Sequence, residues 1–181
     1  MGEKRNVKLF IATSLDGYIA TKNESIQWLD DIEGEGDNGY LRFYEEIDTV
    51  IMGNKTYQWL ESQNLSEFPY QSKDCYVFSR KESGSNENVI FVNDDVERFI
   101  QMLQNKEGRD IWIVGGGELL SSFIEKDLID EYIITVAPII LGGGIPLFKE
   151  ASSVINLLLI GTQKFNQFIE LHYERTIYKK E

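Results

Sequence analysis

Short runs rich in β-branched and aromatic residues alternate with helical patterns along most of the chain, and only β-type runs follow near its end. The segment 95–105, for example, has its apolar residues at the spacing of an amphipathic helix and lies between two strand-like runs. Alternating strands and helices predict a mainly parallel sheet with helices on both faces, and the last β runs predict antiparallel strands at one edge. The predicted strands are 7–13, 49–53, 75–79, 89–92, 111–114, 131–140, 154–163 and 168–178. We therefore expect a three-layer α/β/α fold, and one domain over residues 1–181 because no linker or repeat interrupts the pattern.

Charge and residue counts exclude several classes of function. The chain has 18 Lys and Arg against 30 Asp and Glu, a net charge of −12, which argues against nucleic acid or an anionic membrane as its main partner. Its one cysteine, Cys75, permits no intrachain disulfide, and no apolar run has the length of a membrane span, so we expect a cytoplasmic protein with a buried thiol.

The single histidine, His172, is too little for a histidine-based triad or a multi-histidine metal site, and we expect it to be a structural strand residue. The acidic stretch 29–37 lacks the last carboxylate of a calcium loop, so we expect no bound metal.

Three consecutive glycines at 115–117 join a strand-like run to a helical stretch. They do not form the Rossmann dinucleotide fingerprint, because Leu120 stands where the final glycine is required. A bare backbone before a helix can still receive a phosphate, since glycine permits close approach and the helix start presents free N–H groups and partial positive charge. On this motif alone, a bound dinucleotide pyrophosphate and a tight turn without ligand both remain open.

Four segments in order change that balance: IATSLDGYIA (11–20), VIMGNKTYQWL (50–60), YVFSR (76–80) and IWIVGGGELL (111–120). Together they resemble the dihydrofolate reductase superfamily. Within it, SLDG, SIQWL and the tail DEYIITVAPIILGGGIPLF are most similar to the reductase domain of bacterial riboflavin biosynthesis, the RibD C-terminal domain, whereas MGNKTY looks more like dihydrofolate reductase. The resemblance covers nearly the whole chain and implies a dihydrofolate reductase-like fold, hydride transfer and a reduced nicotinamide cofactor, usually NADPH.

The resemblance also implies the cofactor-binding residues. Some would flank the nicotinamide or start a helix at the phosphates, and others would meet the adenosine 2′-phosphate or lie under the pyrophosphate and nicotinamide ribose. In chain order they are Thr13, Ile19, Gly53, Asn54, Lys55, Thr56, Ser79, Arg80, Gly115, Gly116, Gly117, Glu118, Leu119 and Leu120. Ser79 and Arg80 would take the 2′-phosphate, where a guanidinium suits phosphate oxygens. Dihydrofolate reductases usually have Arg where Asn54 stands, so here Lys55 and Arg80 must favour NADPH over NADH. The first peptide bond of the glycine triplet is cis in those enzymes, and the resemblance implies the same here.

Substrate and catalytic residues are implied in the same way. Dihydrofolate reductases have an acidic residue at the start of the first helix that promotes protonation of the substrate, and at the corresponding spacing before Gly53 this sequence has Asp37. Asp37 also suits a helix N-cap. Trp28 matches a tryptophan near cofactor and substrate in the riboflavin branch, with a packed loop anchor as the alternative. Asp37 and Arg42 are the other expected substrate contacts, Arg42 as the partner of a substrate phosphate. Asp16, in SLDG, reads as a turn residue.

Three functions follow from the sequence. The first is an NADPH-dependent reductase of a small heterocyclic or imine-type substrate, in this family 5-amino-6-(5-phosphoribosylamino)uracil. The alternatives are a dihydrofolate reductase, weakened by Asn54 and by the riboflavin-type segments, and a non-catalytic NADP-binding module.

The second glycine triplet, at 142–144, predicts a loop or bulge between late strands. The apolar run VINLLLIG needs cover at its edge, and riboflavin-type relatives commonly dimerise, so we expect a homodimer.

Overall fold

The computed structural model describes residues 4–150 and 154–176. Its strands are β1 (Val7–Ser14), β2 (Tyr18–Ala20), β3 (Ile47–Gly53), β4 (Asp74–Phe78), β5 (Gly84–Ser85), β6 (Ile90–Val92), β7 (Asp110–Gly115), β8 (Glu131–Ala137), β9 (Ile145–Pro146), β10 (Leu157–Phe165) and β11 (Phe168–Arg175). Its helices are α1 (Tyr40–Glu46), α2 (Asn54–Ser62), α3 (Val96–Gln104) and α4 (Gly117–Glu125), with a 3-10 turn η1 (Gln27–Leu29). Every predicted strand is present with its ends shifted by a few residues, and 177–178 lie outside the described residues.

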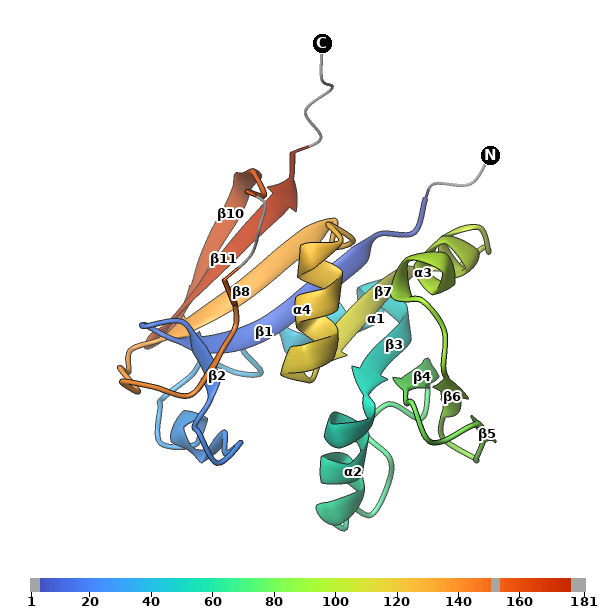
Figure 1. Ribbon diagram of the computed structural model, residues 1–181. Helices are drawn as coiled ribbons and strands as arrows, with labels where there is room; N and C mark the ends of the chain where they lie inside the picture. The colour runs from blue at the N-terminus through green and yellow to red at the C-terminus, as the bar shows by residue number, and fades with distance from the viewer. Residues whose placement is uncertain (1–3, 151–153, 177–181) are drawn as a thin grey trace.

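Within the described residues, nine strands form one sheet in the order β10-β11-β8-β1-β7-β3-β4-β6-β5. The central pairs β8–β1, β1–β7, β7–β3, β3–β4 and β4–β6 are parallel. β11 runs antiparallel to both β8 and β10 at one end of the sheet, and β5 adds a short antiparallel pair with β6 at the other. Figure 1 shows β10 and β11 far from β4 and β6 across this sheet. The predicted mainly parallel sheet with an antiparallel C-terminal edge is confirmed.

Helices cover both faces of the sheet because side chains alternate along each strand. On β1, Leu9 belongs to the core that packs under α3 and α4, whereas its neighbour Phe10 packs with the core under α1 and α2. Figure 1 shows α3 and α4 on the near face and α1 behind the sheet. At the start of α3, Asp95 accepts hydrogen bonds from the amides of Glu97 and Arg98 at 3.0 and 3.2 Å, a side-chain N-cap. The three-layer α/β/α prediction is therefore confirmed, and the thiol of Cys75 is buried under α2 as expected.

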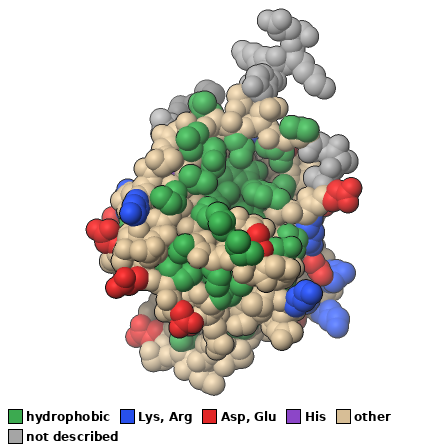
Figure 2. Space-filling model, turned by 90° about the vertical axis from the view of Figure 1, so that its left-hand side faces the viewer, with side chains coloured by type: hydrophobic (Ala, Val, Ile, Leu, Met, Phe, Trp, Pro, Cys, Tyr) green, Lys and Arg blue, Asp and Glu red, His purple; other side chains and the backbone are tan. Residues whose placement is uncertain are grey.

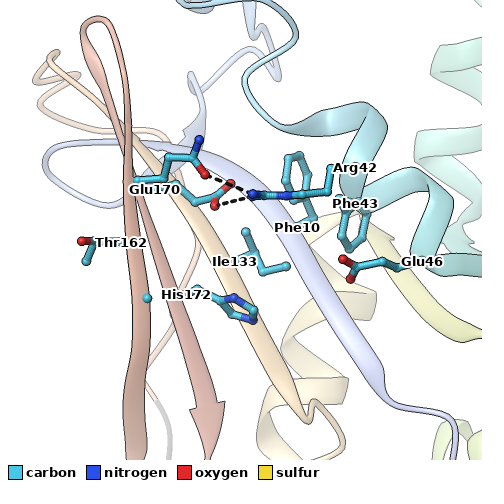
Figure 3. A pocket seen from close by; sticks show the side chains of 10 residues that line it. Phe10, Arg42, Phe43, Glu46, Ile133, Thr162, Glu170 and His172 are labelled. Carbon is cyan, nitrogen blue, oxygen red and sulfur yellow. Dashed lines mark hydrogen bonds and ion pairs between the residues drawn. The ribbon is translucent and has the colours of Figure 1, made fainter.

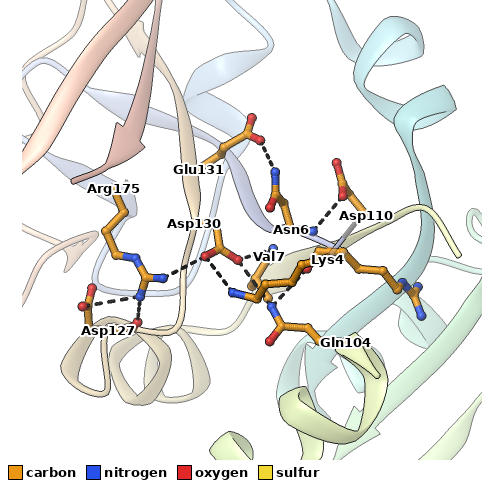
Figure 4. Close-up of polar contacts among 10 residues, drawn as sticks. Lys4, Asn6, Val7, Gln104, Asp110, Asp127, Asp130, Glu131 and Arg175 are labelled. Carbon is orange, nitrogen blue, oxygen red and sulfur yellow. Dashed lines mark hydrogen bonds and ion pairs between the residues drawn. The ribbon is translucent and has the colours of Figure 1, made fainter. Parts of the chain in front are cut away.

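Polar groups lock the amino ends of the strands together (Figure 4). Asp130, just before β8, accepts hydrogen bonds from the backbone N–H of Val7 and from Nη2 of Arg175, both at 2.9 Å. It thereby ties the start of β1 to the end of β11. Because all three groups are largely shielded from water, this is a structural junction rather than an open site.

Lys8, whose side chain is buried, forms ion pairs at the same edge of the sheet. Its Nζ lies 2.9 Å from Glu46 Oε2 and 3.0 Å from Asp110 Oδ2, and Glu131 is nearby. Burial by itself would lower the pKa of Lys8, but the hydrogen bonds to Glu46 and Asp110 and the charge of Glu131 raise it above its usual range. Lys8 is therefore a permanently charged tie between α1, β7 and β8.

The second glycine triplet forms a loop, as predicted. The Asp16 carboxylate accepts hydrogen bonds from the Ser14 hydroxyl at 2.6 Å and from the amides of Leu141 and Gly142 at 3.1 and 2.8 Å. These bonds, that of Ser14 first, hold the pKa of Asp16 below its usual range. At Gly144 a Cβ would lie 2.1 Å from the carbonyl oxygen of Ala20, so only glycine lets β9 pair with β2. Asp16 is thus a turn residue that fastens the loop.

None of the helices in residues 4–150 and 154–176 combines the length and the apolar character needed to cross a membrane. In the same residues, no three His, Cys, Asp or Glu side chains gather as metal ligands would.

Candidate active site

Two helices begin side by side at the carboxyl edge of the sheet. α2 starts directly after β3, and α4 starts after β7. Their starts are joined, because Thr56 Oγ1 accepts a hydrogen bond from the amide of Gly116 at 2.9 Å, and a Cβ on Gly53 would lie 3.8 Å from Gly115 O. The first amides of a helix have no intrahelical acceptor and carry partial positive charge. We call this place, residues 53–56 and 115–119, the phosphate cradle, since its free donors suit an anion.

The backbone of the cradle is bare for a physical reason. Gly115 has a φ of +133°, a conformation that other residues rarely adopt, and a Cβ there would meet no atom within 4 Å. The space beside Gly115 is therefore open to a ligand. The described residues contain no cis peptide bond, so the implied cis bond after Gly115 was wrong. The chain turns here through the positive φ of Gly115 and the hydrogen bond of Gly116 to Thr56.

Polar side chains extend the cradle toward β4. Asn54 Nδ2 donates to Glu82 Oε1 at 3.2 Å, while its buried Oδ1 has no hydrogen-bond partner among the described residues. The Ser79 hydroxyl accepts from the amides of Lys81 and Glu82 at 3.2 and 3.0 Å and so shapes the turn in which Arg80 is exposed. A buried polar atom without a partner costs about 1–3 kcal/mol. Asn54 therefore fits a place that a donor group on a ligand would complete.

Charged side chains flank the cradle on its open side. Lys55 is exposed, with its Nζ 3.8 Å from Glu24 Oε1, a separation at which a surface pair contributes little. Lys55 is therefore free to turn toward a phosphate. Glu118 is exposed in the first turn of α4, where its negative charge counts against an anion. The backbone donors rather than the local charge therefore make this edge suitable for a phosphate.

The remaining expected cofactor residues lie behind or beside the cradle. Thr13 is buried at the end of β1, and Ile19 packs against the core under α4. Leu119 also packs against that core, and Leu120 is fully buried in it, with its amide donating to Gly116 O at 3.0 Å. The free amides of α4 are therefore those of 117–119, and Leu120 supports the turn from inside.

A pocket of about 230 Å³ lies on the α1 face of the sheet, on the opposite side of β1 from the cradle. It is lined by Phe10, Ala12, Leu29, Ile32, Asp37, Asn38, Thr135 and Phe168. We call it the aromatic pocket. Its volume and its phenylalanine rings suit a small flat ring, with a few polar groups to orient it. Sequence reasoning did not single out Phe10, Thr135 or Phe168, because only the pairing of β1, β8 and β11 brings them together.

Asp37 lies in the wall of the aromatic pocket and hydrogen-bonds the first amides of α1. The N-cap residue of α1 is Gly39, so the prediction of Asp37 as the N-cap was wrong in position. Its Oδ1 accepts from the amide of Gly39 at 3.1 Å, and its Oδ2 accepts from the amide of Leu41 at 2.6 Å. A carboxylate has about four acceptor positions, so these bonds leave capacity for a ligand. The geometry thus accommodates both the hydrogen bonds to α1 and the catalytic interpretation of Asp37, and the catalytic role stays a prediction.

Trp28 lies in η1 and packs against Ala137, Phe165 and Phe168. It is buried, is not among the residues that line the aromatic pocket, and its Nε1 has no partner among the described residues. This packing favours the loop-anchor interpretation. A contact between Trp28 and a substrate stays a prediction.

A second cavity, of about 320 Å³, shares Phe10 with the aromatic pocket. Its lining is Phe10, Arg42, Phe43, Glu46, Ile133, Gly161, Thr162, Gln163, Glu170 and His172. We call it the polar cavity. Figure 3 shows Arg42 reaching from α1 across to Glu170 on β11, with Ile133 and His172 farther along the sheet.

The Arg42–Glu170 contact joins an exposed cation to a buried anion. Arg42 is 61% exposed and its Nη2 lies 3.4 Å from Glu170 Oε1, while Nη1 donates to Gln163 Oε1 at 3.2 Å. Glu170 is only 6% exposed, and burial raises its pKa although the positive charge of Arg42 acts against the rise. A phosphate on Arg42 would have to compete with Glu170, so that expected contact stays a prediction. Glu170 was not predicted as a site residue. The signal that could have identified it is a charged residue at an inward-facing position of the predicted strand FIELHYER.

Known proteins are similar to this chain in sequence or in fold. YwjB of Bacillus subtilis strain 168, an uncharacterized protein, is 49% identical over 173 residues, 95% of this chain and 99% of that protein. A solved structure from Shewanella sp. PV-4, described as a riboflavin biosynthesis protein, is 33% identical over 95% of this chain and 99% of that one, with a TM-score of 0.86. Enterococcus faecalis dihydrofolate reductase complexed with NADP(H) has the same fold, with a TM-score of 0.63 at 16% identity over 95% and 97% of the two chains. The family of the RibD C-terminal domain matches residues 5–170, and this chain belongs to it.

Proposed function

We propose that this protein is an NADPH-dependent reductase that acts on a small heterocyclic or imine-type substrate. The observation that carries the proposal is the arrangement of the phosphate cradle and the aromatic pocket on the two sides of β1. Hydride transfer needs a dinucleotide and a flat acceptor held against each other. β1 lines the pocket and pairs directly with β7, the strand that leads into the cradle, so only one strand separates the two places. Membership of a reductase family and the solved NADP(H) complex of the Enterococcus faecalis relative support the choice of cofactor.

In this proposal the chain holds NADPH mainly through its backbone. The free amides at the starts of α2 and α4 take the pyrophosphate, and the open space beside Gly115 lets it come close. Arg80, Lys55 and the Ser79 hydroxyl take the 2′-phosphate, for which a guanidinium offers paired donors. Thr13 and Ile19 border the nicotinamide, which supplies the hydride when the cofactor is bound. A chain of net charge −12 has little general attraction for an anion, so local donors must provide the affinity.

The aromatic pocket receives the flat ring of the substrate and so holds the bond to be reduced near the nicotinamide. Phe10 and Phe168 contact its faces or edges, and Thr135 and Asn38 offer hydrogen bonds that fix its orientation. Asp37 promotes the protonation of the nitrogen next to the carbon that receives the hydride. Within this family the candidate substrate is 5-amino-6-(5-phosphoribosylamino)uracil, with the whole chain acting as one reductase domain.

A screen of NADPH oxidation tests the function. The candidate acceptors are phosphoribosylamino-pyrimidines, dihydrofolate and generic imines. Turnover with the first class supports the riboflavin-pathway reaction, and turnover with dihydrofolate would replace it by dihydrofolate reductase activity. NADPH binding without turnover of any acceptor would leave a binding module.

The Asp37→Asn variant tests the proton source. The amide keeps one acceptor for α1 but holds no proton to transfer. We expect the hydride-transfer rate at neutral pH to fall about 100-fold or more, the scale of general acid catalysis, with NADPH affinity nearly unchanged. Single-turnover kinetics measure this rate directly, and an unaltered rate would remove Asp37 from the mechanism.

We also propose a homodimer in the cytoplasm. β10 ends the sheet and exposes Leu158, Leu159 and Ile160, and Figure 2 shows hydrophobic side chains gathered on this side of the molecule. Exposed edge strands and contiguous apolar patches are typical of interfaces. The buried thiol of Cys75, whose pKa burial raises to about 12, suits a reducing compartment. Sedimentation of the purified chain measures the assembly, and a monomer at all concentrations would contradict the dimer.

A further inference from the structure

The polar cavity contains a buried carboxylate that the protein itself satisfies only in part. Oε2 of Glu170 is buried and has no hydrogen-bond partner among the described residues. Oε1 has one ionic partner, Arg42, at 3.4 Å, which is long for a charge-assisted hydrogen bond. A carboxylate held this way is costly to bury, because both oxygens leave water and only one regains a partner. Glu170 therefore has unused capacity for a donor.

The charges around Glu170 favour a cation over an anion. Glu46 on α1 lines the same cavity, and its carboxylate is balanced by Lys8. His172, the next inward-facing residue on β11, has its Nε2 2.9 Å from Glu131 Oε2, and like Arg42 it favours the ionised form of Glu170. Arg42 is the one exposed cation among the lining residues that the structure describes. A phosphate or sulfate would meet the carboxylates of Glu46 and Glu170 in the cavity wall, whereas an ammonium group would be attracted by them.

The rest of the cavity wall is apolar and aromatic. Phe10 and Phe43 stack on each other with ring centroids 4.5 Å apart and an interplanar angle of 16°, and Ile133 lies next to Phe10 on β8. Aromatic rings beside carboxylates are suited to organic cations, because the rings contact the carbon skeleton and attract the positive charge. The cavity of about 320 Å³ has room for a small molecule of this kind.

We propose that the polar cavity is a second ligand site that binds a small organic cation, a primary amine with an apolar body. The ammonium group lies on Glu170, where its three donors reach both carboxylate oxygens, and the body lies against Phe10, Phe43 and Ile133. The site is separate from the phosphate cradle, which lies on the other side of β1. It shares Phe10 with the aromatic pocket, so an occupant would contact the wall of the proposed substrate site.

Arg42 has a defined role in this site. Its guanidinium is a cation already resting on Glu170, and it is mostly exposed, so it can swing into solvent when an amine arrives. Arg42 is then a competitor of the ligand rather than a contributor to its binding. Removing the charge of Arg42 should therefore strengthen amine binding, whereas removing the charge of Glu170 should weaken it.

Phenethylamine is the probe, with 2-phenylethanol as its neutral counterpart and sulfate as a permanent anion. Calorimetric titration at pH 7.5 into the wild-type chain should show the amine binding tighter than the alcohol by about 10-fold or more, the ratio expected for a charge-assisted hydrogen bond. Glu170→Gln should abolish this preference. Arg42→Gln should tighten amine binding several-fold. Glu125→Gln, the same charge change at the exposed end of α4, should leave amine binding as in the wild type.

The outcomes separate this proposal from the reductase proposal. NADPH affinity is measured on each variant, and it should not change in Glu170→Gln if that variant is folded. Amine binding that is equal in wild type and Glu170→Gln, no amine binding at all, or sulfate binding that depends on Arg42 would each overturn the cation site. If Glu170→Gln does not fold, the sign of the Arg42→Gln effect decides, because weaker amine binding there would contradict competition. If NADPH does not bind to the wild-type chain, the reductase proposal is contradicted and the amine result still stands.

Discussion

The two ends of the same parallel strands differ in how completely their polar groups are used. At the amino ends, Asp130 and Lys8 are surrounded by oppositely charged or hydrogen-bonding partners at close to 3 Å. At the carboxyl ends, the first amides of α2 and α4 point away from any helical acceptor, and Asn54 Oδ1 has no partner among the described residues. The first edge stabilises the fold through these pairs, although Arg175 Nε there has no partner among the described residues. The second edge keeps helix amides that a ligand or solvent can bind, and one buried acceptor, Asn54 Oδ1, that a ligand donor would satisfy.

The difference follows from chain direction. In a βα unit the helix starts at the carboxyl end of its strand, so free amides and positive helix ends collect at one edge. The opposite edge receives the loops that return to the sheet, and there the sequence supplies paired Asp, Glu, Lys and Arg side chains. A substitution at the amino edge should therefore change stability and spare cofactor binding, whereas one at the carboxyl edge should do the reverse.

The largest effect is expected from Asp130→Ala. It leaves the Val7 amide and the largely buried Arg175 without their shared acceptor, as Figure 4 shows. We expect the free energy of unfolding to fall by about 3 kcal/mol, as when one partner of a buried ion pair is removed. NADPH affinity of the folded fraction should not change. Chemical denaturation followed by circular dichroism measures the loss.

Asp127→Ala is the matched control for that change. Asp127 also approaches Arg175, with Oδ2 3.4 Å from Nη1, but it is 55% exposed, against 15% for Asp130. We expect a loss below about 0.5 kcal/mol, as for surface ion pairs. Equal losses for the two variants would mean that burial does not distinguish them and would break the comparison between the edges.

A smaller effect, on binding rather than stability, is expected from Arg80→Ala. Its guanidinium is exposed in the turn after β4, beside the cradle. NADPH affinity should fall about 10- to 100-fold, as for the loss of hydrogen bonds to a charged phosphate, while NADH affinity stays within a few-fold. Arg98→Ala, which removes another exposed arginine on α3, should affect neither cofactor. Equal losses of NADPH and NADH in Arg80→Ala would remove the 2′-phosphate role.

The smallest effect concerns Glu170, which belongs to neither edge. Burial raises the folded-state pKa of Glu170 above the unfolded value, so the folded protein binds its proton more tightly, and wild-type stability falls as the pH rises between those two pKa values. Glu170→Gln removes the free-energy cost of burying this negative charge. We expect this variant to be more stable than wild type by about 1 kcal/mol at neutral pH, or ~2–4 °C in Tm for a chain of this size. The difference should vanish in acid, where Glu170 is protonated in both states. A constant difference across pH would show that the charge is not its cause.

The sequence was sufficient for features with local causes. Strand and helix positions follow from periodicity, the bare turn at 115–117 from glycine itself, and the Asp16 turn from short-range hydrogen bonding. These elements also place the cradle, because chain order alone puts both helix starts at the same edge of a parallel sheet.

Features that depend on distant packing could not be predicted. Arg42 and Glu170 are 128 residues apart and meet because the Arg42 side chain reaches from α1 to β11, a placement that no local pattern encodes. The short strands β2 and β9 likewise exist through their mutual pairing. Asp37 shows an intermediate case, since its hydrogen bonding to the start of α1 was visible in the sequence, but neither the N-cap residue, Gly39, nor the position of Asp37 in the wall of the aromatic pocket was.

Calorimetric titration of NADPH into the wild-type chain tests most directly whether the carboxyl edge is a dinucleotide site. If the free amides of the cradle and the exposed Arg80 act together, NADPH should bind with a micromolar or lower Kd, more tightly than NADH. The absence of NADPH binding at micromolar concentrations would contradict the cofactor assignment and leave the glycine turn at 115–117 as a structural feature.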